Sequence, residues 1–373
     1  MVVYMKNLFI SNLNKKDVDH FTTDIGLLIR RKTDKAFKKI CNVFTNVNII
    51  RENFDKLSDD EHFTNYPLEY KNSKEYPLNA KKHNIILERY PELNDDEPYI
   101  FVSNHTCPED IETILNVLDR NAYLVLGSID SLKYNPEMYL SFLNGMIPFD
   151  IMDKKERHEL MDKMARVLKT NSILIFPEGS HNFSPNKLIN NLYDGPVNLS
   201  LRTGRKIVLV TLVRDNDNNV SYIDVSNPID VKNIDVPSNL DEKNKVKCLS
   251  SYLRDKMATA VYCLSARHLE MIHRVPNDKI EDKIREEKIE DAFKKLHWNK
   301  DVFEAEYLTK KTKEEIEYNE VQETISNLRY DLSVLRDTLL DIKDYVIRNE
   351  DVHNKDVVEA MRKHLILSKN KKI

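Results

Sequence analysis

Glycine is scarce in this chain of 373 residues, which contains only 6 glycines. Neither of the glycine-rich patterns that cradle nucleotide phosphates, GxGxxG and GxxxxGK[ST], occurs anywhere in it. The sequence therefore gives no support to a nucleotide-binding domain of the Rossmann or P-loop type.

Cysteine is also rare and dispersed. The 4 cysteines are Cys41, Cys107, Cys248 and Cys263, and no two of them form a CxxC pair. This spacing argues against a disulfide scaffold and against a structural zinc site. We expect reduced, mostly buried thiols and no bound metal.

The chain lacks long apolar runs and a marked excess of charge. No uninterrupted run approaches the roughly 18 apolar residues that span a bilayer, and the segment from Met1 to Lys6 does not resemble a signal peptide. The net charge is only −4, so nothing favours nucleic acid as a partner. We expect a soluble, cytoplasmic protein with a sizeable core, because 41% of its residues are hydrophobic.

Short apolar runs alternate with amphipathic segments in the middle of the chain, which predicts an α/β fold. The expected strands are 85–87, 99–102, 122–126, 173–176, 207–213 and 220–225, and the expected helices are 110–118, 136–143, 155–168 and 196–202. We predict a mixed, mostly parallel sheet flanked by helices.

The N-terminal part of the chain has a helical period from Asp17 to about Ile50. Its polar side is basic, with six Lys or Arg and one acid between residues 30 and 39. Two interpretations stay open. The segment 18–47 makes peripheral contact with anionic lipid on the inner membrane face, or it is a solvated helix packed on the main domain. A polar connection from residue 51 to 83 follows.

The C-terminal part is expected to be helical after Pro237. Apolar residues from Tyr318 to Val346 alternate at steps of three and four, the heptad period of a coiled coil. A homo-oligomer through 318–346 is one interpretation, and an intramolecular helical hairpin is the other. The expected division is a helical arm with linker over 1–83, an α/β domain over 84–272 and a helical extension over 273–373.

One motif follows the second expected strand of the sheet. Thr106 and Glu109 have the spacing of a capping box, which predicts a helix that starts with Thr106 as its N-cap. His105 and Asp110 then occupy the two positions that touch across a helix start. A carboxylate on one ring nitrogen leaves the other nitrogen free to act as a base, whereas a capped helix with a surface histidine is the alternative.

A second motif, FPEGSH over 176–181, follows the strand 173–176. Glu178 and Gly179 bring a carboxylate and a flexible turn to the same sheet edge as the first motif. The alternative is an ordinary turn from a strand to a loop, with no function.

The two motifs together resemble those of the glycerolipid acyltransferases, whose best-known members are the lysophosphatidate acyltransferases. Asn104, His105 and Asp110 match the first block of that family. The segments 145–150 and 176–179 match its second and third blocks, and 195–210 resembles the stretch running into the fourth. The resemblance covers about residues 85–230.

The resemblance implies acyl transfer from an acyl thioester, acyl-coenzyme A or acyl carrier protein, to a hydroxyl of a lipid or polar acceptor. It implies that His105 is the general base and that Asp110 orients it. Backbone donors around Gly179 stabilise the oxyanion in this interpretation, and no cofactor or metal takes part. The implied substrate-binding residues are Asn104, Glu178, Gly179, Ser180, His181, Lys154 and Lys155.

Two departures from the family pattern concern the acceptor. The second and third blocks usually end in arginines that bind a phosphate, and this chain has Ile151 and His181 there. Neither side chain replaces a bidentate guanidinium. A phosphate-free acceptor, or a phosphate bound by other cations such as Lys154 and Lys155, are the alternatives. A third possibility is an inactive acyltransferase fold that serves as a membrane scaffold through its coiled coil.

Overall fold

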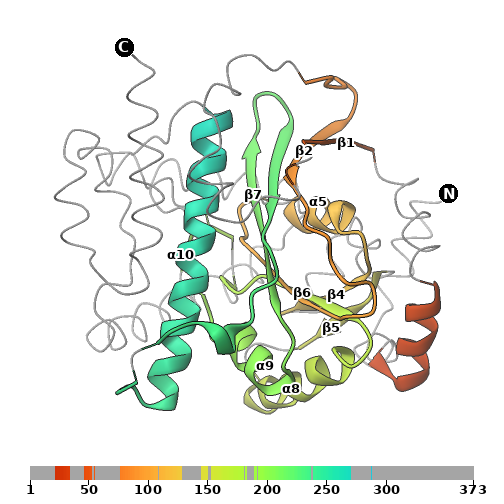
Figure 1. Ribbon diagram of the computed structural model, residues 1–373. Helices are drawn as coiled ribbons and strands as arrows, with labels where there is room; N and C mark the ends of the chain where they lie inside the picture. The colour runs from red at the N-terminus through yellow and green to blue at the C-terminus, as the bar shows by residue number, and fades with distance from the viewer. Residues whose placement is uncertain are drawn as a thin grey trace.

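The structure is a computed structural model of the full chain (Figure 1). It describes residues 22–33, 46–52, 54, 76–107, 109–127, 144–149, 153–179, 181–182, 189–190, 192–236, 238–269 and 287. The expected helix 136–143, the coiled coil at 318–346, Cys41, Ile151 and Ser180 lie outside these residues.

The described part of the chain forms an α/β domain around one sheet of eight strands, in the order β1-β2-β8-β7-β3-β6-β4-β5. The strands are β1 (Val47–Arg51), β2 (His83–Arg89), β3 (Ile100–Ser103), β4 (Ala122–Leu126), β5 (Met146–Pro148), β6 (Ser172–Ile175), β7 (Ile207–Asp215) and β8 (Val220–Val225). All neighbouring pairs are parallel except β7 and β8, which form an antiparallel hairpin. The predicted mixed, mostly parallel sheet is confirmed.

Side chains alternate between the two faces of the sheet, so each face has its own apolar core. Phe101 and Leu87 lie in one core with Ile114 of helix α5 (Asp110–Val117). Val102 and Ile86 lie in the other, with side chains of α8 (Lys154–Val167), α9 (Gly195–Thr203) and α10 (Glu242–His268). Figure 1 shows α10 running along the sheet beside β7, and α8 and α9 below it. A 3-10 turn, η4 (Val231–Asn233), precedes α10.

Strand positions in the middle of the chain agree closely with expectation, and helices 110–118, 155–168 and 196–202 are confirmed within one residue at each end. The expected helix at the N-terminus is only partly confirmed. Residues 24–33 are helical, but Val47–Arg51 form β1 instead of a last helical turn. The β-branched residues Val47, Ile49 and Ile50 suit an edge strand on β2, and the expected domain limit at residue 84 consequently falls inside the sheet. The short strand β5 was not expected.

The C-terminal end of α10 is tied to the sheet by buried charges. Arg267 and His268 both contact the carboxylate of Glu88, which is completely buried in β2. The next residue, Arg89, makes a two-point ion pair with Asp224 of β8, with N–O distances of 3.0 and 3.1 Å. Paired charges of this kind fix the relative position of helix and sheet, because separating them leaves a charge buried alone.

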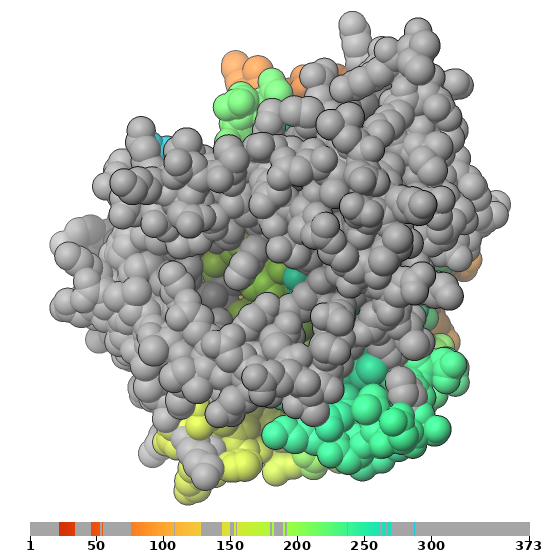
Figure 2. All heavy atoms as spheres, turned by 90° about the vertical axis from the view of Figure 1, so that its left-hand side faces the viewer, coloured from red at the N-terminus to blue at the C-terminus, as the bar shows by residue number. Residues whose placement is uncertain are grey.

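The length and apolar character of the described helices bear on contact with a membrane. None of the described helices combines the length and apolar character needed to cross a bilayer. Figure 2 shows one face of the molecule, on which α8 and the first turns of α10 form the lower surface.

Candidate active site

The site lies where β3 and β6 end at the same edge of the sheet. Val102 pairs with Ile175 in the register of these two parallel strands, so the loops that follow them start side by side. One loop carries His105, and the other carries Glu178 and His181. This confirms that the two sequence motifs meet at one edge.

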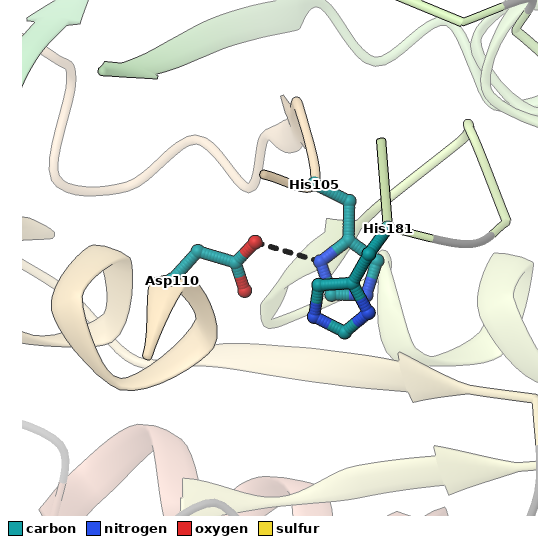
Figure 3. A group of neighbouring side chains, drawn as sticks. All are labelled: His105, Asp110 and His181. Atoms are coloured by element: carbon teal, nitrogen blue, oxygen red, sulfur yellow. Dashed lines mark hydrogen bonds and ion pairs between the residues drawn. The ribbon is translucent and has the colours of Figure 1, made fainter. Parts of the chain in front are cut away.

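His105 and Asp110 form a hydrogen-bonded pair. The ring nitrogen Nδ1 of His105 donates to Oδ2 of Asp110 over 2.7 Å (Figure 3). The side chain of Asp110 is fully buried, while that of His105 is 13% exposed. The buried carboxylate fixes the proton on Nδ1 and leaves Nε2 as the basic nitrogen.

The sequence predicted this contact from a helix that starts with Thr106 as its N-cap, and that helix start is wrong. Helix α5 starts one residue after Glu109, not after Thr106, so Thr106 is not its N-cap. Oδ2 of Asp110 instead accepts the backbone N–H groups of Thr106 and Cys107, over 2.9 and 3.4 Å. The carboxylate of Asp110 therefore organises the loop itself, and it accepts the N–H of Thr106 that a capping box would have assigned to Glu109.

Two aromatic rings lie against the His105 imidazole. The ring of His181 stacks on it with centroids 3.6 Å apart and an interplanar angle of 30° (Figure 3). The ring of Phe176 lies 4.6 Å away at 39°. These neighbours limit rotation of the catalytic candidate about its side-chain bonds.

Glu178 holds the backbone of the site. Its Oε1 accepts the N–H of His105 over 2.8 Å, and its Oε2 accepts the N–H of Asn190 over 2.7 Å. Burial raises the pKa of this carboxyl to about 7, although both N–H bonds and the charges of His105 and Arg254 oppose the rise. The sequence predicts Glu178 as a substrate-binding residue, whereas here both of its oxygens serve the protein backbone.

Asn104 and Gly179 are also engaged within the protein. The amide of Asn104 both donates to the carbonyl and accepts from the N–H of Leu212 in β7, each over 2.9 Å. Gly179 has a φ of 71°, in the left-handed region that favours glycine, and its N–H closes the turn onto the carbonyl of Phe176 over 3.0 Å. The N–H of Gly179 is therefore engaged within the turn, and the expected role of the backbone donors around Gly179 stays a prediction.

The predicted cations lie on α8. Lys155 projects into solvent with its side chain 83% exposed and lies 3.8 Å from Glu159. Lys154 is the first residue of the same helix. The structure gives no contact between Lys155 and the His105 loop, so the predicted phosphate contact of these lysines stays a prediction.

The group His105, Asp110 and His181 also has the donor set of a metal site. One ligand atom from each residue lies within 4.8 Å of the others. Zinc accepts two imidazoles and a carboxylate. However, the lone pairs of imidazole lie in the ring plane, so coordination of one ion by both rings requires them to leave the stack. The arrangement suits proton transfer better than metal binding.

Sequence reasoning missed three residues that shape the site. Asn182 donates its N–H to the carbonyl of His105 over 2.6 Å, and Asn190 binds Glu178. Arg254 of α10 lies close enough to Glu178 to lower its pKa. Two of these contacts use backbone atoms, and the third bridges residues far apart in sequence, so no local pattern could have indicated them.

Comparison with known proteins agrees with the motifs. Residues 83–213, about a third of the chain, match the sequence model of the acyltransferase family. This range contains both motifs, strands β2 to β6 and most of β7, so the chain carries an acyltransferase domain and the resemblance drawn from the sequence is confirmed there. No curated protein matches the chain.

Among solved structures, a match is the crystal structure of the 1-acyl-sn-glycerophosphate (LPA) acyltransferase, PlsC, from Thermotoga maritima. The match has 13% sequence identity and a TM-score of 0.36, and it covers 69% of this chain and 97% of the other.

Proposed function

We propose that this protein transfers a fatty acyl group from an acyl thioester, acyl-coenzyme A or acyl carrier protein, to a hydroxyl of a lipid or polar acceptor. The observation that carries the proposal is the 2.7 Å bond from His105 Nδ1 to Asp110 Oδ2, inside the segment that matches the acyltransferase family. A buried carboxylate behind a partly exposed imidazole is the arrangement that general base catalysis needs.

The proposed reaction moves one proton and exchanges one bond. Nε2 of His105 removes the proton of the acceptor hydroxyl while its oxygen attacks the thioester carbonyl. When the tetrahedral intermediate collapses, the carbon–sulfur bond breaks and the imidazolium returns the proton to the thiolate. Asp110 stays ionised throughout and stabilises the imidazolium, and no covalent intermediate with the protein forms.

A phosphate-free acceptor is supported by His181, one of the two positions at which the family pattern usually has an arginine. His181 is 8% exposed and lies flat against His105, so its ring is not extended toward a ligand as an arginine can be. Glycerol 3-phosphate and lysophosphatidate are expected to be poor competitors for the acceptor site.

Contact with a membrane is proposed through helix 24–33. Its inner side is anchored, because Leu27 lies in the core and Arg30 is buried beside Tyr123. Its outer side exposes Ile25, Leu28 and Ile29 by 73, 52 and 57%. Three large apolar side chains next to the exposed cations Arg31 and Lys32 suit the interface of an anionic bilayer.

Release of free thiol from acyl-coenzyme A or acyl carrier protein tests the proposed function. The purified protein is mixed with each donor, with and without a lipid extract as acceptor source, and the thiol is followed with a colorimetric reagent. Acceptor-dependent release is expected. No release above the donor's own hydrolysis with either carrier would favour the alternative, an inactive acyltransferase fold acting as a membrane scaffold.

A further inference from the structure

The stacked rings of His105 and His181 are the closest aromatic contact among the described side chains of the site. The catalytic proposal uses only one of them. Among the described residues, Asp110 of α5 bonds to the ring of His105, Glu178 in the turn after β6 accepts the N–H of His105, and the charge of Arg254 of α10 acts on Glu178. Burial raises the pKa of the neighbouring Cys107 thiol, which is therefore neutral and adds no charge.

These surroundings are unequal for the two rings. Asp110 bonds directly to Nδ1 of His105, so a proton taken up by the pair is stabilised on His105. Once His105 is an imidazolium, a second positive charge on a ring whose centroid lies 3.6 Å away is opposed by repulsion in a buried site. Charge on both imidazoles at once is therefore disfavoured.

We propose that His181 is a positioning residue that acts as a neutral ring. Its stack fixes the plane of the His105 imidazole, and its lack of charge lets His105 become an imidazolium during acyl transfer. The catalytic part of this inference rests on the proposed function, whereas the pairing of the rings rests on geometry alone.

The position of His181 also bears on the acceptor. A neutral imidazole is a poor ligand for a phosphate dianion, and a protonated one would compete with the charge that develops on His105. The replacement of arginine by His181 thus exchanges an anion-binding side chain for an aromatic one. An acceptor that presents an uncharged hydroxyl-bearing group at this place fits the site.

Nitrogen-15 NMR of labelled histidines tests the charge relationship without any activity. In the wild type, the pair is expected to take up its two protons in separate steps, because a charge on one ring opposes a charge on the other. Replacing His105 with Phe removes the first charge, so protonation of His181 should become easier. The exposed His158 on α8 is the internal control and should not move.

A second substitution guards against loss of the fold. His105→Gln keeps a hydrogen-bond donor for Asp110 and should produce the same shift in His181. If His181 titrates at the same pH in the wild type and in both folded variants, the two rings are not coupled and the inference is wrong, whether or not the protein is an acyltransferase.

Activity tests the positioning role. His181→Ala is expected to lower kcat about tenfold with a smaller effect on KM for the acyl donor, because the His105 ring then loses one of the contacts that fix its plane. His181→Phe keeps an aromatic face without a titratable group and should recover most of the loss. A Phe variant no better than the Ala variant would contradict a role for the ring face.

Discussion

The carboxylate of Glu178 receives the backbone N–H of His105 at 2.8 Å, while its second oxygen receives that of Asn190 at 2.7 Å. The loop that carries the basic candidate and the loop that follows β6 are thus joined through one buried side chain. Since Asn182 also donates to the carbonyl of His105, the peptide groups of this residue are held from both sides. The position of the imidazole is set by its backbone as well as by Asp110.

Glu178→Gln should loosen this junction. The amide oxygen of glutamine can accept one of the two N–H groups, but its NH2 end cannot accept the other, which leaves a buried donor unpaired. We expect a loss of about 1–3 kcal/mol in the free energy of unfolding and a drop in kcat with little change in KM. Urea unfolding and steady-state kinetics measure both. Unchanged stability would show that the junction contributes nothing.

The same carboxyl should titrate near neutral pH. Its pKa is raised from 4.5 to about 7 in the folded protein, mainly by burial, so the folded protein binds this proton more tightly than the unfolded chain does. The contribution of this tighter proton binding to the free energy of unfolding is complete below pH 4.5, and it decreases as the pH rises to about 7. Infrared spectroscopy should show a protonated carboxyl band that disappears around pH 7 and is absent from Glu178→Gln. Full ionisation already at pH 5 would refute the shift.

Asp110→Asn should separate the effect of the charge of Asp110 from the effect of its size and shape. Asparagine has nearly the same shape as aspartate, but it cannot stabilise an imidazolium and it does not fix the proton on Nδ1 of His105. We expect kcat to decrease by at least about 10²-fold while the circular dichroism spectrum stays that of the wild type. Wild-type kcat in a folded Asn variant would exclude the proposed pair.

The buried charges that anchor α10 predict a stability effect far from the site. Glu88→Ala leaves Arg267 buried without its carboxylate partner, and we expect a loss of about 3–5 kcal/mol. The matched control is Arg202→Ala, which removes an exposed ion pair with Asp162 and should cost less than about 1 kcal/mol. Chemical unfolding of both variants provides the comparison, and equal losses would contradict the account of the anchor.

The exposed apolar side of helix 24–33 predicts binding to vesicles that contain anionic lipid. Leu28→Glu places a negative charge on the exposed apolar side and should abolish sedimentation with vesicles that contain anionic lipid. Leu78→Glu, at another exposed leucine with 46% exposure, should not. Binding that both variants retain would remove the proposal that this helix meets the bilayer.

The sequence predicted the strands well because most contain short apolar runs, such as Ala122–Leu126 and Ile100–Ser103. It also predicted that His105 and Asp110 touch, since five residues of chain and a helix start bring them together. It failed where long-range pairing decides the structure. The segment Val47–Arg51 has a helical period but completes the sheet against β2.

At the site, too, local features were predicted from the sequence and long-range contacts were not. Motifs indicated which residues meet at the sheet edge, but not which of their atoms are already occupied. The family resemblance implies that Asn104 and Glu178 bind substrate. Only the fold shows that they bind the backbone of Leu212, His105 and Asn190.

The central claim is that one imidazole removes the proton from the acceptor, and it is tested most directly by the formation of acylated product. Radiolabelled acyl thioester is incubated with a lipid extract and either the wild type, His105→Ala or the surface control His158→Ala, and the labelled lipid is quantified. The account predicts acylated lipid with the wild type and with His158→Ala, and a decrease of at least about 10²-fold with a folded His105→Ala. Equal product from His105→Ala and the wild type would contradict it.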